Sequence, residues 1–196
     1  MSRWIDRAQL LAAGPDRRIL GIAGAPAAGK SRLAAAVVAA VPASVLVPMD
    51  GFHLPTAVLA ARGWVAERGT PRTFDDAGYV ALLRALRTAR GAESAPDFDR
   101  SREEPVPGAI DVPASARLIV TEGNYLLCWP QVRALLDECW YVEVDENVRV
   151  ERLVARHVLF GRTREAARER ATLGSDADNA RLVAASRSLA DVIVKG

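Results

Sequence analysis

Short apolar runs alternate along the chain with longer segments in which apolar residues recur every three or four positions. Such short runs are typical of strands buried on both faces of a sheet, and the longer segments are typical of helices that cover a sheet. The alternation favours βαβ units, and hence an α/β fold built on a parallel sheet. The predicted strands are residues 18–23, 44–49, 117–121, 139–144 and 190–194.

Helices are predicted between these strands. Residues 2–12 form an amphipathic helix with Trp4, Ile5, Ala8 and Leu11 on its inner face, and Pro42 ends the helix that follows the first strand. The other predicted helices are residues 30–41, 75–90, 129–137, 145–160, 163–173 and 176–188. The expected architecture is three-layered, α/β/α, in a single domain spanning residues 1–196.

Three stretches depart from this regular order, at about residues 52–74, 91–115 and 156–175. The first holds helix-sized pieces broken by proline and glycine, and the second, rich in proline and charge, is predicted as an irregular loop or a short hairpin. We expect these stretches to be excursions beside the site, the last of them a small lid.

Composition excludes several classes of protein. The chain has 196 residues, 50% of them hydrophobic and 26% charged, which suits a folded domain with a real core. Its net charge of +2 disfavours a nucleic-acid partner. The absence of a membrane-length apolar run or a signal-peptide pattern predicts a cytoplasmic protein that does not bind membranes. Cys128 and Cys139 lack metal-site spacing, and two histidines do not support a His-rich site.

The basic residues are unevenly divided, because 24 are arginine and only Lys30 and Lys195 are lysine. Lys30 lies in a G-x-x-x-x-G-K-S motif that follows the first predicted strand and opens a predicted helix. This is the pattern of a phosphate-binding loop, whose glycines turn backbone N–H groups inward and whose helix adds its N-terminal amides. The predicted ATP-binding residues are Gly24, Ala25, Pro26, Ala27, Ala28, Gly29, Lys30, Ser31 and Arg32.

Two carboxylates follow predicted strands, Asp50 after the second and Glu122 at the end of the third. Both are expected at the carboxyl edge of the sheet beside the phosphate loop. Asp50 is predicted to accept the proton of an attacking hydroxyl, and Ser31 and Glu122 to hold Mg²⁺. The alternative for each carboxylate is a structural role in capping a turn, because a glycine follows both of them.

Several longer motifs extend the pattern. They are residues 47–55 (VPMDGFHLP), 69–75 (GTPRTFD), 95–100 (APDFDR) and 121–126 (TEGNYL). With the phosphate loop, they make the chain resemble the P-loop kinases that comprise phosphoribulokinase, uridine kinase and bacterial pantothenate kinase. The closer likeness is to small members of that family described as nucleoside or fructose-transport kinases.

This resemblance implies an ATP-dependent kinase that phosphorylates a hydroxyl of a nucleoside, a pantothenate-like compound or a sugar. It implies catalytic roles for Lys30, Asp50 and Arg156, and Arg152, Arg156 and Arg162 are expected on the lid. Arg149, Arg152 and Arg156 also share one predicted helix face. The candidate substrate residues are Asp50, Phe52, His53, Arg72, Phe98, Arg100, Arg102, Asn124 and Tyr125, although the aromatic and arginine side chains among them also suit packing or surface positions.

The sequence leaves a second function open, a P-loop ATPase or nucleotide switch that acts on a protein partner. That function requires the phosphate loop and Glu122 but has no use for an acceptor-facing Asp50. For a kinase the expected partner is a small-molecule substrate, with ATP and Mg²⁺ as the other ligands. The oligomeric state, including a homodimer, stays open.

Overall fold

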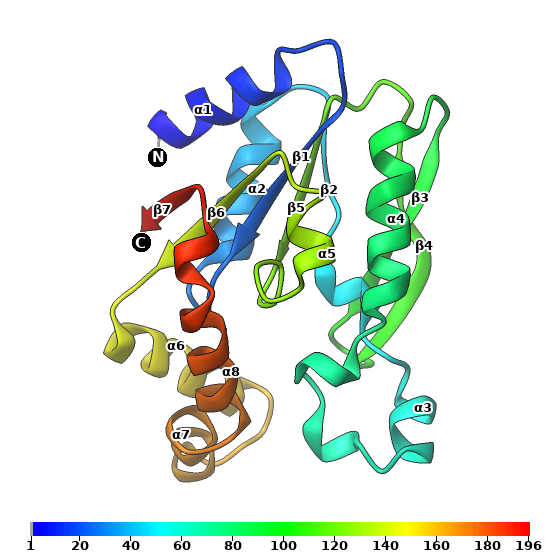
Figure 1. Cartoon of the computed structure of the whole chain (residues 1–196). Coiled ribbons are helices and arrows are strands. Elements are labelled where there is room, and N and C mark those ends of the chain that lie inside the picture. The colour runs from blue at the N-terminus through cyan, green and yellow to red at the C-terminus, as the bar shows by residue number, and fades with distance from the viewer. Residues whose placement is uncertain (1) are drawn as a thin grey trace.

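A parallel five-stranded sheet forms the centre of the computed structural model, which describes residues 2–196 and, for Ser2, the backbone alone. The strand order is β2-β5-β1-β6-β7, and every paired neighbour is parallel (Figure 1). The strands are β1 (Arg18–Ala23), β2 (Ser44–Leu46), β5 (Leu118–Gly123), β6 (Glu138–Glu143) and β7 (Val192–Lys195). The predicted α/β fold with a parallel sheet is therefore confirmed.

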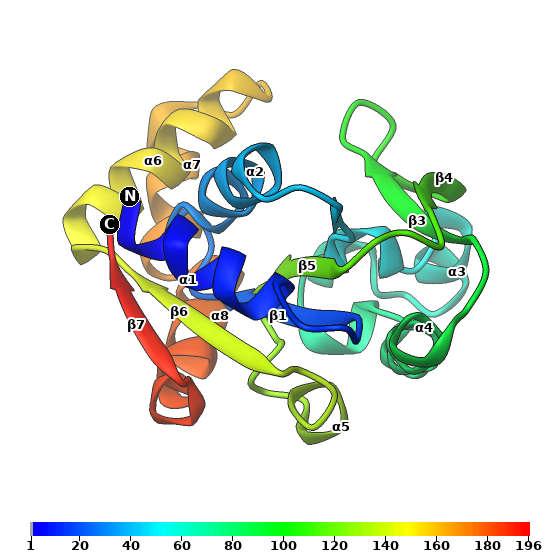
Figure 2. The ribbon, with the colours of Figure 1, turned by 90° about the horizontal axis from the view of Figure 1, so that it is seen from above.

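Helices cover both faces of this sheet and give the expected three layers (Figure 2). On one face, α1 (Ser2–Ala12) and α2 (Lys30–Ala40) bury Ala8, Leu33 and Val37 against alternate residues of β1, β5 and β6. On the other face, α4 (Asp76–Thr88), α5 (Pro130–Arg133) and α8 (Ser175–Ala185) cover the remaining alternate residues. Among the helices of residues 2–196, none is long and apolar enough to span a bilayer.

The excursions from the regular order form small units of their own. Residues 52–74 contain α3 (Thr56–Ala61) and two short 3₁₀ turns, Val65–Glu67 and Pro71–Thr73. Beyond β6, α6 (Glu146–Leu159) and α7 (Arg164–Thr172) form a helical pair that we call the lid. Its own apolar cluster, which includes Leu153 and Ala167, packs on Ala27 of the phosphate loop.

Two sequence predictions about elements were wrong, and a third was right only in part. The strand predicted over residues 44–49 ends at Leu46, because the chain turns at Pro48 into a 3₁₀ turn, η1 (Met49–Phe52). The helix predicted over residues 129–137 is only α5, because Asp137 already lies beside Ile19 at the entrance to β6. Residues 93–112 form a full antiparallel hairpin, β3 (Glu93–Asp99) and β4 (Glu104–Val112), rather than a loop or a short hairpin.

Candidate active site

The phosphate loop joins β1 to α2, and its backbone conformation explains its glycines. Gly24 has φ of +150°, and a Cβ there would lie 2.7 Å from the carbonyl oxygen of Val142 on β6. Gly29 has φ of +104°, in the left-handed region that favours glycine. Ala27 also has a positive φ, +64°, which the motif does not require of it. The loop is thus shaped to present backbone N–H groups to an anion at the start of α2.

Lys30 is buried at the base of this loop. Its Nζ donates to the carbonyl oxygen of Ala25 at 3.1 Å and to Oδ1 of Asn124 at 2.8 Å. Burial lowers the pKa of Lys30, and the carboxylates of Glu122 and Asp50 oppose that change. A buried ammonium group with neutral partners is poised to bind a further anion.

Ser31 and Glu122 face each other beside Lys30. The Ser31 hydroxyl donates to Oε1 of Glu122 at 2.8 Å, and burial raises the pKa of Glu122 while Lys30 opposes the rise. A hydroxyl and a carboxylate are the hard oxygen donors that Mg²⁺ prefers. Within residues 2–196, no cluster of three or more acidic, histidine or cysteine side chains forms a separate metal site. The pair therefore fits an Mg²⁺ ion, which these two side chains would hold beside the phosphate loop.

Asp50 lies on η1, four residues beyond the end of β2, and its carboxylate accepts a hydrogen bond from Nη2 of Arg100 at 2.7 Å. Nδ1 of His53 donates to the backbone carbonyl of Asp50 at 2.9 Å. Burial lowers the pKa of His53, which therefore favours its neutral form. The ring of His53 packs 4.0 Å from that of Phe74 and 4.6 Å from that of Phe98, between centroids. Asp50 is thus held beside an aromatic wall.

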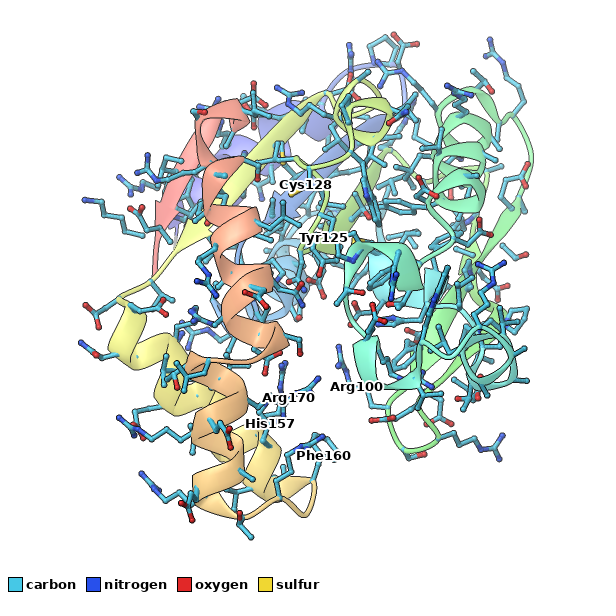
Figure 3. All side chains as sticks on the ribbon, turned by 60° about the horizontal axis from the view of Figure 1, so that its bottom comes forward. Arg100, Tyr125, Cys128, His157, Phe160 and Arg170 are labelled. Atoms are coloured by element: carbon cyan, nitrogen blue, oxygen red, sulfur yellow. The ribbon has the colours of Figure 1, made fainter. Side chains whose placement is uncertain are left out.

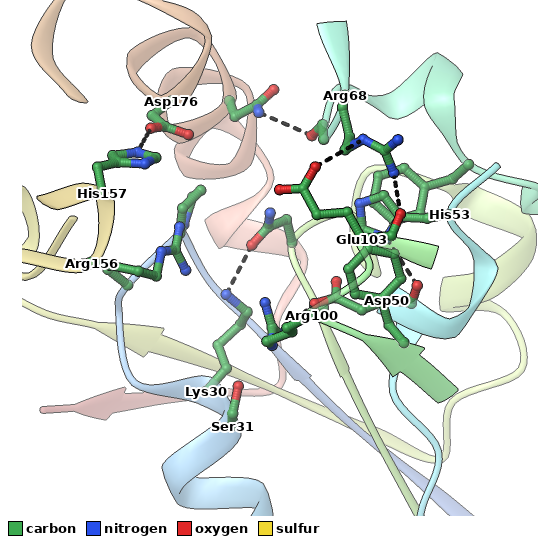
Figure 4. Close-up of a pocket in the computed structure, with 18 of the residues that line it drawn as sticks. Lys30, Ser31, Asp50, His53, Arg68, Arg100, Glu103, Arg156, His157 and Asp176 are labelled. Carbon is green, nitrogen blue, oxygen red and sulfur yellow. Dashed lines mark hydrogen bonds and ion pairs between the residues drawn. The ribbon is translucent and has the colours of Figure 1, made fainter. Parts of the chain in front are cut away.

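These groups open into one cavity of about 980 Å³ (Figure 4). The phosphate loop and Glu122 line one part of it, Asp50 and the hairpin line a second, and the lid and the start of α8 line a third. Figure 3 shows His157 and Arg170 reaching into the opening from the lid, with Arg100 on the other side. His157 contacts Asp176 of α8 at 2.6 Å between Nε2 and Oδ2.

Most of the residues predicted from the sequence lie around this cavity. Those that line it are Pro26, Ala27, Gly29, Lys30, Ser31, Arg32, Asp50, His53, Phe98, Arg100, Arg102, Glu122, Asn124, Arg152, Arg156 and Arg162. Gly24, Ala25 and Ala28 are buried within the phosphate loop and shape it from behind.

Three candidate substrate residues lie elsewhere. Phe52 is buried in the core, with its ring 4.9 Å from that of Tyr79. The fully buried Tyr125 donates through its hydroxyl to the carbonyl oxygen of Gly69 at 2.5 Å. Arg72 pairs with Glu67 and lies over the ring of Trp64. Packing and local ion pairing account for all three, and we correct their placement in the substrate site.

The three arginines expected on one face of α6 have two different environments. Arg152 and Arg156 line the cavity, whereas Arg149 is buried and pairs with Glu146 in the first turn of the helix. Seven residues advance a helix by about 10 Å, so residues on one face need not meet the same surroundings.

Sequence reasoning missed several cavity residues, among them Thr56, Arg68, Glu103, Arg170 and Asp176. Arg68 is firmly held, because its guanidinium donates to Thr56 Oγ1 at 2.6 Å and to the carbonyl oxygen of Glu103 at 2.7 Å. No local motif marks these residues, since the cavity brings them together from segments far apart in the chain. His157 also lines the cavity, and it could have been singled out from the sequence because the chain has only two histidines.

This arrangement combines an anion cradle, a buried ammonium, a metal-suited oxygen pair and a separate carboxylate around one space. The first three suit the phosphates of a nucleotide. The fourth lies where a second reactant can meet it, beside the aromatic wall. The cavity is therefore equipped for phosphoryl transfer between two bound molecules.

None of the protein-family models matches the chain. It is 38% identical over 161 residues to an ATP-dependent kinase-like protein of Aspergillus versicolor, covering 76% of this chain and 94% of that one. It is 33% identical over 174 residues to a candidate uridine kinase of Schizosaccharomyces pombe, covering 80% of this chain and 73% of that one.

Structural likeness agrees with these matches. The crystal structure of a candidate fructose transport system kinase from Silicibacter sp. TM1040 superimposes with a TM-score of 0.88, at 35% identity, over 97% of this chain and 98% of that one. Relatives of this identity and coverage share more than a fold. The chain belongs to the P-loop kinases, in the family whose members include proteins named as uridine kinases and pantothenate kinases.

Proposed function

We propose that this protein is a cytoplasmic kinase that transfers the γ-phosphoryl group of ATP to a hydroxyl of a small metabolite, with Mg²⁺ bound. The observation that carries the proposal is the position of Asp50, whose carboxylate lines the same cavity as Lys30 and the phosphate loop. A protein that only bound or hydrolysed a nucleotide would not require a carboxylate on the side of the cavity away from the loop.

Each group has a role in this transfer. Asp50 accepts the proton of the acceptor hydroxyl. At the same time the hydroxyl oxygen bonds to the γ-phosphorus, and the bond between that phosphorus and ADP breaks. Lys30 and the loop amides hold the phosphates and stabilise charge that develops on them. Ser31 and Glu122 would hold Mg²⁺, which supplies further neutralisation of phosphate charge. Arg152, Arg156 and Arg162 of the lid line the cavity, as does Arg170, and could contact the transferring group.

The names of related proteins suggest the first acceptors to test. Relatives and structural neighbours are named for uridine, pantothenate and fructose transport. A panel built on a nucleoside, pantothenate and simple sugars, with ADP formation and phosphorylated product as readouts, therefore covers neutral and anionic acceptors.

The Asp50→Asn substitution tests the proposed base. Asparagine keeps the size of the side chain and can still accept a hydrogen bond from Arg100, but it cannot take up a proton. We expect kcat for acceptor phosphorylation to fall by roughly 10²–10⁴-fold, the usual contribution of a general base. Binding of Mg·ATP, measured by calorimetry, should stay unchanged, because Asp50 does not touch the phosphate loop.

Asp178→Asn is the matched control, because Asp178 is an exposed carboxylate of α8 paired with Arg181. Near-native turnover of D50N, together with a normal D178N, would refute the role of Asp50. ADP formation that requires a protein partner and yields no phosphorylated metabolite would instead favour a nucleotide switch.

A further inference from the structure

The contact between Arg100 and Asp50 opposes the proton transfer proposed for Asp50, and it indicates which kind of acceptor the site binds. Nη2 of Arg100 donates to Oδ2 of Asp50 at 2.7 Å, so one of the two oxygens of the proposed base is already hydrogen-bonded to a cation. Phosphoryl transfer moves the hydroxyl proton to this carboxylate as the new O–P bond forms and ADP leaves. An Asp50 oxygen released from Arg100 is the better proton acceptor.

The backbone on the two sides of this pair is closely packed, whereas the Arg100 side chain is largely exposed. A Cβ on Gly51 would lie 2.4 Å from the carbonyl oxygen of Pro96, so the hairpin packs directly against the turn that carries Asp50. Arg100 extends from the end of β3 with 59% of its side chain exposed. Arg68, on the same side of the cavity, is 15% exposed and already bound to Thr56 and Glu103. Of these two arginines, Arg100 is the one that can change partner.

A guanidinium group that leaves one carboxylate needs another anion, and it binds carboxylate and phosphate groups in the same two-pronged way. The cavity favours such a ligand, because cationic residues outnumber carboxylates by nine to four among the described residues that line it. The neutral His53 ring and the Phe98 ring beside Arg100 offer an apolar surface for the carbon skeleton of the acceptor.

Building on the proposed kinase function, we propose that the acceptor is a hydroxy compound that carries a carboxylate or phosphate near its reacting hydroxyl. Arg100 binds that anion and, in doing so, releases Asp50 to accept the proton. Without an anionic acceptor, the Arg100–Asp50 pair keeps the carboxylate from activating water. Arg100 is thus both a specificity-determining residue and a restraint on wasteful hydrolysis of ATP.

The test compares acceptors that differ in charge, in the native protein and in Arg100→Gln. The probes are glycerate and glycerol 3-phosphate against glycerol, and ribose 5-phosphate against ribose. We expect the native protein to favour at least one anionic member by tenfold or more in kcat/KM, about the value of one charge-assisted contact. R100Q should lose that preference, because the rate with the anionic member falls while the rate with the neutral member rises once Asp50 is released from Arg100. Whether carboxylates or phosphates are favoured identifies the anion.

Hydrolysis of Mg·ATP in the absence of any acceptor gives a second readout. It should rise several-fold in R100Q and return to the native rate or below in the D50N/R100Q double variant. Arg181→Gln, which removes an exposed arginine paired with Asp178 outside the cavity, is the matched control and should match the native protein in both assays.

Equal phosphorylation of the charged and neutral members of every pair by the native protein, at rates above background, would overturn the proposal. So would an equal loss on both members in R100Q, since an arginine that merely positions Asp50 affects all acceptors alike. These outcomes are distinct from failure of the proposed function, which would appear as no phosphorylated product from any acceptor, charged or neutral.

Discussion

At the scale of single residues, Lys30 shows why one lysine persists in an arginine-rich chain. Its Nζ lies between the Ala25 carbonyl and the Asn124 side chain and is almost fully buried. A planar guanidinium is larger and holds its donors in a fixed fork, so it cannot occupy the same space. A positive charge alone therefore does not explain why position 30 is a lysine; the size and shape of the side chain matter as well.

We expect Lys30→Arg to lower kcat by about 10²-fold or more, comparable to the loss of one preorganised donor to the reacting group. Steady-state phosphorylation with the best acceptor of the panel measures this effect. Lys195→Arg is the natural control, since it changes the only other lysine, which is exposed at the end of β7. Equal activity of K30R and K195R would show that the loop needs only a positive charge.

At the scale of elements, Asp137 joins three parts of the fold. Its carboxylate accepts hydrogen bonds from the Ile19 amide of β1 at 2.8 Å, from Arg18 at 2.9 Å, and from Arg87 of α4 at 3.0 and 3.1 Å. Burial tends to raise the pKa of Asp137, but these hydrogen bonds and the charge of Arg87 outweigh it and lower the pKa. The ionised form therefore stabilises the folded state.

Asp137→Asn should lower stability at pH 7 by roughly 1–2 kcal/mol, because both arginines are partly exposed and the ion pairs are screened. For a chain of this size that corresponds to a fall in Tm of roughly 2–8 °C. A lowered pKa means that the contribution is present above the unfolded pKa of about 3.9 and is lost as the pH falls below it. Thermal unfolding from pH 7 to pH 3 should thus show the native and variant curves converging. A constant difference would contradict this role.

Element by element, the sequence predicted what local patterns determine. The strand at residues 18–23 and the helix at 2–12 have the predicted bounds, because each follows from a continuous apolar run or a helical period. The β3–β4 hairpin was underestimated, since Pro96, Pro105 and Pro107 argue against strands, yet a two-stranded sheet with open edges tolerates them. The Arg100–Asp50 pair could not be predicted, because it joins residues 50 positions apart through the docking of that hairpin.

At the scale of the whole molecule, the cavity is assembled from parts that have separate cores. The lid has its own apolar cluster, which meets the phosphate loop at Ala27, while Asp50 and the hairpin belong to the other side. A nucleotide bound between them would contact both and so oppose the unfolding of either. Mg·ATP at about 100 times its Kd should add about 2.7 kcal/mol, which is a rise in Tm of roughly 5–10 °C.

The dependence of this thermal shift on metal tests the role of Glu122. Without Mg²⁺, a buried carboxylate beside Ser31 repels the triphosphate, so ATP with a chelator should raise the Tm of the native protein much less than Mg·ATP. Glu122→Gln removes both the repulsion and a metal ligand. The variant should therefore show a larger shift than the native protein with ATP alone, and little further gain when Mg²⁺ is added. If E122Q instead gained as much from Mg²⁺ as the native protein, Glu122 would not be a ligand of the metal, and its contact with Ser31 would serve only to shape the loop.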